Sequence, residues 1–137
     1  MEIACPHCGQ RNRVPAERLA QGPVCGRCRE PLLSGPVNAG PQLLAELIAQ
    51  DSLPVLVDFW APWCSPCRAM TPVLHSLARD FTVCKVNTDK NPRLAAGFEV
   101  AAIPLLLIFR NGQVVRRYEG VTDEATLRAD LTALTGQ

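Results

Sequence analysis

The chain has 137 residues, enough for one ordinary globular core and a small appendage but too few for two full domains. Its 14 Lys and Arg residues nearly balance its 13 Asp and Glu residues, so the overall charge does not favour a polyanion or an anionic membrane surface as a partner. The longest apolar run, Val100–Phe109, is too short for a membrane-spanning helix and contains a proline.

The seven cysteines are the most unusual part of the composition. The first residues show no basic segment followed by an apolar one, so no secretory signal is visible and we expect a cytoplasmic protein. Thiols stay reduced in that compartment. Metal binding and catalysis therefore explain the cysteines better than a disulfide framework does.

Residues 1–35 hold four of the cysteines and almost no periodic apolar pattern, so this segment needs something other than a core to hold it together. Its cysteines form two Cys-x-x-Cys pairs separated by 16 residues, a spacing typical of a four-thiolate zinc site. Pro and Gly residues around both pairs favour tight turns. The alternatives are a pair of disulfides or an empty site. The predicted zinc ligands are Cys5, Cys8, Cys25 and Cys28, and His7 is a weaker candidate ligand.

After residue 35 the chain becomes regular. Segment 31–41, with three prolines and two glycines, is predicted to be a linker. Apolar spacing and turn residues then predict helices over 42–50, 65–81, 91–98 and 122–136, and strands over 53–60, 82–89, 103–109 and 113–120. The order of these elements predicts an α/β domain, a mixed sheet with helices on both faces.

Some local details accompany these elements. Pro72 should kink the helix over 65–81, and Asn91 should cap the next helix, with Pro92 at its first position. An Asn-Gly turn at 111–112 should join the last two strands as a hairpin. Thr122 or Asp123 should cap the final helix.

A third Cys-x-x-Cys pair, Cys64 and Cys67, lies where a buried strand turns into a helix. The partial positive charge of a helix N-terminus favours a thiolate at Cys64, which we expect to be more exposed than Cys67. The alternative, a second metal pair, needs two further ligands. Only Cys84, His75 and His7 remain, at no recognisable spacing. The pair is therefore interpreted as a redox dithiol.

The segment VDFWAPWCSPCRAMTP, from Val57 to Pro72, resembles the active-site segment of thioredoxins. The resemblance extends from residue 37 to the end of the chain through KVNTDKNP, IPLLLIFRNG and the last helix. The front segment resembles the zinc ribbon of a bacterial class of second thioredoxins. The resemblance implies a thioredoxin fold over residues 36–137 after a zinc ribbon over residues 1–35.

Carried over by position, the resemblance implies specific roles. Cys64 is expected to be the nucleophile and Cys67 the resolving cysteine, with Trp63 as an aromatic wall. Asp58 is expected behind Cys67, with Lys85 as its charged neighbour. Ile103 and Pro104 are expected to form a cis-proline loop that faces the disulfide.

Two positions depart from the usual family pattern. Ser65 stands with Pro66 between the cysteines, where Gly-Pro is common, so the redox potential is open. Leu105 follows the cis-proline, where Thr is common, which leaves a more apolar substrate groove of open selectivity.

Elementary chemistry agrees with these roles. Burying Asp58 in an apolar strand is costly unless it is paired or holds a proton, so it can accept the proton of Cys67; an ion pair with Lys85 is the alternative. A proline that opens a strand gives no ladder N–H, but a cis bond there presents the backbone of Ile103 to an extended peptide. Cys84 is expected to be a small buried apolar residue, or otherwise a regulatory thiol.

These expectations describe a reductase of protein disulfides that works through a mixed disulfide, with structural zinc and no bound organic cofactor. The resemblance implies recycling by an NADPH-dependent flavoprotein reductase. Two rival functions are possible for such a sequence. Nucleic-acid binding is disfavoured because residues 1–35 carry five Arg against three acidic residues and no aromatic residue. A disulfide-forming oxidant or isomerase would need an oxidising compartment.

Overall fold

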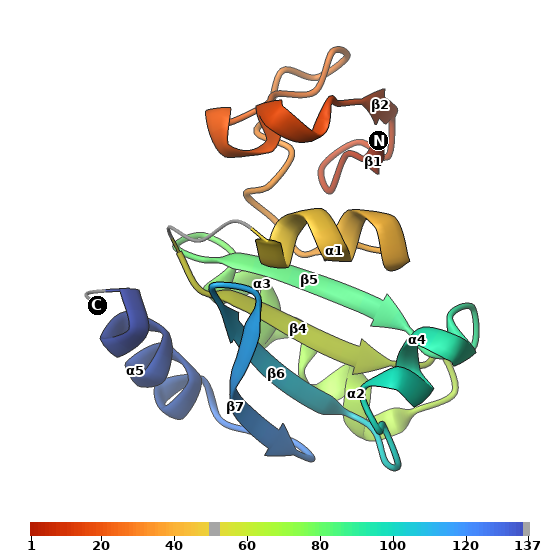
Figure 1. Ribbon diagram of the computed structural model, residues 1–137, viewed down its shortest axis with the longest axis vertical. Coiled ribbons are helices and arrows are strands. Elements are labelled where there is room, and N and C mark those ends of the chain that lie inside the picture. Colours follow the sequence, from red (N-terminus) through yellow and green to blue (C-terminus); the bar gives the residue numbers. More distant parts are fainter. Residues whose placement is uncertain (50–52, 136–137) are drawn as a thin grey trace.

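A computed structural model describes residues 1–49 and 53–135. Figure 1 shows a central sheet with helices on both of its faces and a small separate unit beyond α1. The elements are β1 (Glu2–Ala4), β2 (Arg11–Arg13), the 3-10 helix η1 (Ala16–Gln21), β3 (Val37–Asn38), α1 (Pro41–Ala49), β4 (Val55–Trp60), α2 (Ser65–Ala69), α3 (Thr71–Leu77), β5 (Thr82–Asn87), α4 (Pro92–Gly97), β6 (Leu105–Arg110), β7 (Gln113–Glu119) and α5 (Glu124–Thr135).

The large sheet has the strand order β3-β5-β4-β6-β7. β3, β5 and β4 are parallel, and β6 and β7 continue the sheet in antiparallel pairs. The predicted mixed sheet is therefore confirmed. The edge strand β3 was not predicted, because its two residues lie in the segment expected to be a linker and are too few to show a period of two.

The two faces of the sheet carry separate apolar clusters. Alternate residues of β4 point to opposite faces, so Val57 and Phe59 pack on the side of α1, whereas Leu56 packs with α3 and α5. The predicted helices on both faces follow from this alternation. Asp58, two residues after Leu56 on the same strand, points to the same face of the sheet as Leu56.

The predicted helix over 65–81 is two helices and ends early. α2 stops at Ala69 and α3 starts at Thr71, because Pro72 has no N–H to bond to the carbonyl of Arg68. α3 ends at Leu77, and residues 79–81 form turns closed by bonds to the carbonyls of Ser76 and Leu77. The break places a short helix of its own directly after Cys64.

The predicted caps and turn differ in outcome. Asp123, not Thr122, caps α5, since its carboxylate accepts the N–H of Thr126 at 3.0 Å. Asn91 precedes α4 without a side-chain capping bond, because its amide donates to the carbonyl of Asn87 instead. The Asn111-Gly112 turn is confirmed, with positive φ at both residues. Gln50 and Gly136, predicted to end two of the helices, lie outside the described residues.

Residues 1–35 form the small unit in Figure 1, which we call the ribbon. Its own sheet is the antiparallel pair β1 and β2. Four buried apolar residues of the ribbon share one cluster with the α1 side of the large core; they are Ile3, Val14, Leu19 and Leu32. The apolar packing is therefore continuous from the ribbon into α1.

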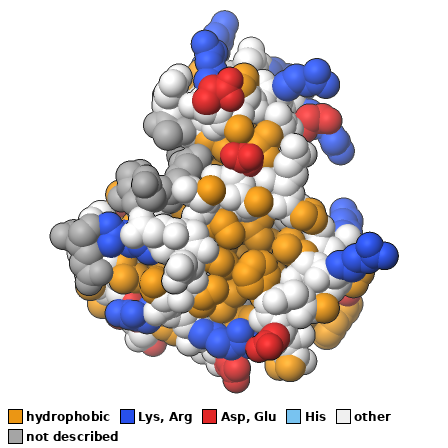
Figure 2. Space-filling view, viewed as in Figure 1, with side chains coloured by type: hydrophobic (Ala, Val, Ile, Leu, Met, Phe, Trp, Pro, Cys, Tyr) orange, Lys and Arg blue, Asp and Glu red, His pale blue; other side chains and the backbone are white. Residues whose placement is uncertain are grey.

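The surface also reflects this arrangement. Figure 2 shows hydrophobic side chains gathered over the central part of one face, with Lys and Arg side chains around its rim and on the ribbon. Among the described residues, no helix is long and apolar enough to cross a membrane.

Candidate functional site

Cys64 and Cys67 form a disulfide at the start of α2, with their Cα atoms 5.3 Å apart. β4 ends at Trp60, and the following turn is closed by a bond from the N–H of Cys64 to the carbonyl of Ala61. Cys64 is the N-cap residue of α2, and its Sγ accepts the N–H of Cys67 at 3.1 Å. A donor aimed at this sulfur favours its thiolate once the disulfide is reduced.

The expected difference in exposure between the two cysteines is wrong for this oxidised form. Cys64 is 3% exposed and Cys67 is 5% exposed. Ala61, Trp60 and Ile103 pack around the two cysteines, while Trp63 beside Cys64 is 68% exposed. What distinguishes the cysteines is their place on the helix, because Cys64 caps it and Cys67 lies in its first turn.

The walls of the site come from two loops distant in sequence. The Ile103–Pro104 peptide is cis, as the resemblance implies, and the carbonyl oxygen of Ile103 lies 3.9 Å from the Sγ of Cys64. Trp63 donates its indole N–H to the carboxylate of Asp89 at 3.1 and 3.2 Å. Sequence reasoning missed Asp89, because an exposed aspartate in a turn after a strand carries no pattern of its own.

Asp58 lies on β4, opposite Lys85 of β5 in the parallel register. It is 1% exposed, and neither of its carboxylate oxygens has a hydrogen-bond partner among the described residues. Burial raises the pKa of Asp58 to about 7, and the charge of Lys85 opposes this rise only in part.

Lys85 does not form an ion pair with Asp58 in the described part of the chain. Its Nζ lies 4.4 Å from the centre of the Trp60 ring, in a cation–π contact. The alternative of a structural ion pair at Asp58 is therefore not supported by the geometry. Of the sequence-based candidates, Asp58 and Lys85 lie in the carboxyl-terminal halves of β4 and β5, and Cys64 and Cys67 lie at the start of α2.

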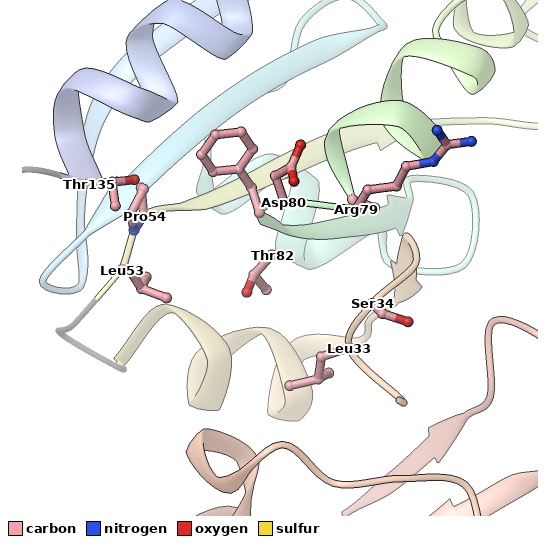
Figure 3. A pocket seen from close by; sticks show the side chains of 10 residues that line it. Leu33, Ser34, Leu53, Pro54, Arg79, Asp80, Thr82 and Thr135 are labelled. Carbon is pink, nitrogen blue, oxygen red and sulfur yellow. The ribbon is translucent and has the colours of Figure 1, made fainter. Parts of the chain in front are cut away.

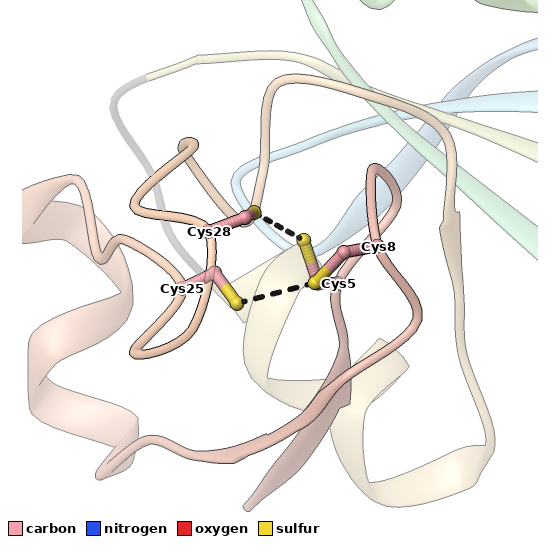
Figure 4. A group of neighbouring side chains, drawn as sticks. All are labelled: Cys5, Cys8, Cys25 and Cys28. Atoms are coloured by element: carbon pink, nitrogen blue, oxygen red, sulfur yellow. Dashed lines mark hydrogen bonds between the residues drawn. The ribbon is translucent and has the colours of Figure 1, made fainter.

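The sulfur atoms of the four ribbon cysteines form one cluster, shown in Figure 4. All four sulfur atoms lie within 4.8 Å of one another. Cys5 and Cys28 are 3.6 Å apart, and Cys8 and Cys25 are 3.7 Å apart. Four thiolates at zinc bond lengths of about 2.3 Å would be about 3.8 Å apart, so the donor set fits zinc.

Backbone N–H groups point at sulfurs of this cluster. His7 and Arg27 donate to Cys5 and Cys25 at 3.4 and 3.3 Å. Hydrogen bonding, first of all from the N–H of Cys28, lowers the pKa of Cys25, whereas burial and the neighbouring thiols raise the pKa of Cys28, because crowded thiols do not all ionise together. The ring of His7 instead contacts the hydroxyl of Ser34 at 2.9 Å, so His7 is not among the clustered ligands.

Cys84 lies apart from both cysteine sites. It is fully buried on β5 between Val37 of β3 and Val57 of β4, and burial raises the pKa of its thiol to about 12. This environment agrees with the expected apolar role.

A cleft of about 220 Å³ lies at the other end of the sheet, where β4 and β5 begin. Figure 3 shows Leu33 and Ser34, from the segment after the last ribbon cysteine, on one side of it and Arg79, Asp80 and Thr82 on the other, with the guanidinium of Arg79 directed away. The parallel strands run away from this cleft, so it is separate from the disulfide.

Known proteins similar to this chain agree with the geometry. The family model described as Thioredoxin matches residues 37–133, and the model described as Thioredoxin 2, N-terminal, matches residues 4–30. The chain is 40% identical over 124 residues to Thioredoxin C-3 of Corynebacterium nephridii, covering 88% of this chain and 86% of that protein. It is 45% identical over 84 residues to Thioredoxin 1 of Synechococcus elongatus, covering 58% and 78%.

A solved structure gives the same result. A mutant thioredoxin from Halobacterium salinarum superposes with a TM-score of 0.70 at 31% identity, covering 75% of this chain and 93% of that one. Together with the Cys64–Cys67 disulfide, the matches establish a thiol-disulfide oxidoreductase with a thioredoxin fold. The chain belongs to the thioredoxin family, in the class that carries an N-terminal zinc ribbon.

Proposed function

We propose that the protein reduces disulfides of client proteins, with Cys64 as the nucleophile and Cys67 as the resolving thiol. The observation that carries this assignment is the N–H of Cys67 aimed at the Sγ of Cys64 at 3.1 Å. The lower the pKa of a thiol, the larger its thiolate fraction at neutral pH, and only the thiolate attacks.

The first step forms a mixed disulfide. The Cys64 thiolate attacks one sulfur of the client disulfide, which breaks the client S–S bond. The other client sulfur leaves as a thiolate and takes a proton from water. The carbonyl of Ile103 near Cys64 and the exposed ring of Trp63 are the groups we assign to holding the client backbone beside the sulfur.

The second step needs a base for Cys67. The proton of Cys67 passes to the carboxylate of Asp58, directly or through water, and the new thiolate attacks the Cys64 sulfur. The second client sulfur leaves, so the client gains two electrons and the enzyme becomes the Cys64–Cys67 disulfide. A pKa of about 7 suits Asp58 to this exchange near neutral pH. In this mechanism the positive charge of Lys85 limits the rise in the pKa of Asp58.

Recycling and location follow from the same chemistry. We propose that an NADPH-dependent flavoprotein reductase returns electrons to the disulfide, as for the family. A reducing compartment, the cytoplasm, suits a chain whose remaining five cysteines are unpaired in the structure.

For the ribbon we propose one structural zinc held by Cys5, Cys8, Cys25 and Cys28, supported by the distances among their sulfurs. When bound, the ion would tie the two Cys-x-x-Cys turns together in a closed site. We place the boundary between the units at residue 35, so that residues 36–137 form the thioredoxin domain. Continuous apolar packing across this boundary indicates that the two units stabilise each other.

Insulin reduction tests the proposed function. With dithiothreitol or with NADPH and a thioredoxin reductase, the protein should accelerate the precipitation of reduced insulin, and a Cys64→Ser variant should not. Equal rates with and without the protein would refute the assignment as a general protein-disulfide reductase.

A further inference from the structure

Three hollows on the surface share lining residues and join the ribbon to the redox site. The first, of about 340 Å³, lies on the ribbon between Arg13 and Val24. The second, of about 520 Å³, lies between the ribbon and the start of α1, and Arg13 lines it as well. The third, of about 380 Å³, shares Gly40 with the second and ends at Trp60. We call these three hollows together the basic groove.

The groove ends beside the active site. Trp60 packs against the cluster of Ala61, Cys64 and Cys67. Lys90 lines the same hollow and follows Asp89, the acceptor for the indole of Trp63. A polypeptide lying in the groove would therefore run from the ribbon to the edge of the disulfide.

The charge of the groove is one-sided. Its lining contains four basic residues, Arg13, Arg18, Lys85 and Lys90, and one acidic residue, Glu2. Glu2 lies 3.8 Å from Arg11, outside the lining, which offsets its charge. Arg13 and Arg18 are exposed and form no ion pair with any described residue. Their charges are free for a partner.

The ribbon end of the groove also offers apolar contact. Val24, a branched side chain between Pro23 and the proposed zinc ligand Cys25, is 50% exposed. A partner that satisfies both features carries carboxylates and an occasional apolar side chain. Nucleic acid fits less well, because no aromatic residue of the ribbon can stack on a base.

We propose that the basic groove binds an extended acidic segment of a client protein and thereby directs the disulfide next to that segment towards Cys64. The ribbon then contributes to the choice of client while the dithiol carries out the reaction. This inference rests on the proposed function, since it names the class of client that the redox site would reduce.

Two peptides of the same length test the groove. Each contains one disulfide followed by a tail, which alternates Glu and Leu in one peptide and Gln and Leu in the other. The enzyme variants are R13E/R18E, which reverses two charges of the groove, and R79E/R116E, which makes the same change in net charge at exposed positions outside it. Zinc content is measured in both variants.

We expect R13E/R18E to lower kcat/KM for the Glu peptide about tenfold at low salt and to leave the Gln peptide unchanged. The loss should fade as salt screens the charges. R79E/R116E should leave both peptides within about twofold of the wild type. An equal loss on both peptides, or the same loss with R79E/R116E, would overturn the groove proposal. So would the absence of any loss with R13E/R18E.

A redox-inert peptide separates this proposal from the reductase itself. The Glu tail without cysteines, added to isotope-labelled protein, should shift the amide signals of Arg13, Gly40 and Lys90 and not that of Arg79. Shifts there with failed insulin reduction would support the groove and contradict the proposed function. Normal insulin reduction without these shifts would contradict the groove proposal alone. Displacement of the peptide by a lower concentration of a single-stranded oligonucleotide would also contradict it.

Discussion

Asp58 and Lys85 face each other across the β4–β5 pair, yet the ammonium contacts the Trp60 ring and both carboxylate oxygens lack a partner among the described residues. A carboxylate left in this state prefers to hold a proton, and its pKa rises to about 7. The pair therefore places a carboxyl group of nearly neutral pKa inside the sheet, on β4.

Replacing Asp58 by Asn should slow the resolving step. Without a base, the proton of Cys67 has no acceptor near neutral pH, so we expect turnover in insulin reduction to fall about tenfold or more. The loss should shrink at alkaline pH, where Cys67 ionises unaided. A pH–rate profile of both proteins measures this, and identical profiles would leave Asp58 as a purely structural residue.

The same substitution should stabilise the oxidised protein. The pKa of Asp58 rises from 3.8 to about 7 on folding, so the folded state loses stability as pH rises through that interval. Asn escapes a penalty of about 4 kcal/mol at alkaline pH, and almost none at about pH 4. Urea unfolding at both pH values should show a gain confined to the higher one. A gain of equal size at both would point to packing instead of charge.

The roles of the two cysteines should separate in a trapping experiment. Cys67→Ser keeps the sulfur that accepts the N–H at the helix start but removes the resolving thiol, so it should accumulate mixed disulfides with clients. Cys64→Ser should trap none. Non-reducing gels followed by mass spectrometry provide the measurement, and trapping by the Cys64→Ser protein would reverse the assignment.

Loss of zinc should affect the ribbon first. We expect the purified protein to contain one zinc per chain and to release it to a chelator or to peroxide, which oxidises the thiolates. In NMR spectra, the amide signals of residues 1–35 should then cover a narrower range of chemical shifts. Those of α1 should shift because α1 packs against the ribbon. Insulin reduction by Cys64 and Cys67 should remain. Complete loss of activity with both still reduced would make the ribbon part of the active site.

Gly35 offers a test of how the ribbon is attached. A Cβ added there would lie 2.9 Å from the Cβ of Pro6, in the turn between Cys5 and Cys8. Gly35→Ala should therefore cost about 1–3 kcal/mol and weaken zinc retention against a chelator. The control is Gly97→Ala at the end of α4, where an added Cβ meets no described atom within 4 Å beyond its own helix and neighbours, and stabilisation of up to about 1 kcal/mol is expected. Equal effects of the two changes would contradict the contact.

Local patterns in the sequence were sufficient to locate the two cysteine sites. Two Cys-x-x-Cys pairs with a fixed spacing predict four clustered sulfurs, because tight turns and ligand number are local properties. A Cys-x-x-Cys pair at a change from strand to helix predicts a thiolate at a helix start for the same reason. The hairpin turn at Asn111-Gly112 also follows from local backbone preferences.

Tertiary structure decided what depends on distant neighbours. The burial of Cys64, the carboxylate of Asp89 as acceptor for Trp63, and the distance of Lys85 from the carboxylate of Asp58 arise from loops and strands brought together by the sheet. β3 is a strand only because β5 lies beside it. The packing of the ribbon on α1 likewise joins residues 3–32 to residues 43–47, and sequence periodicity records which residues are apolar but not which segment covers them.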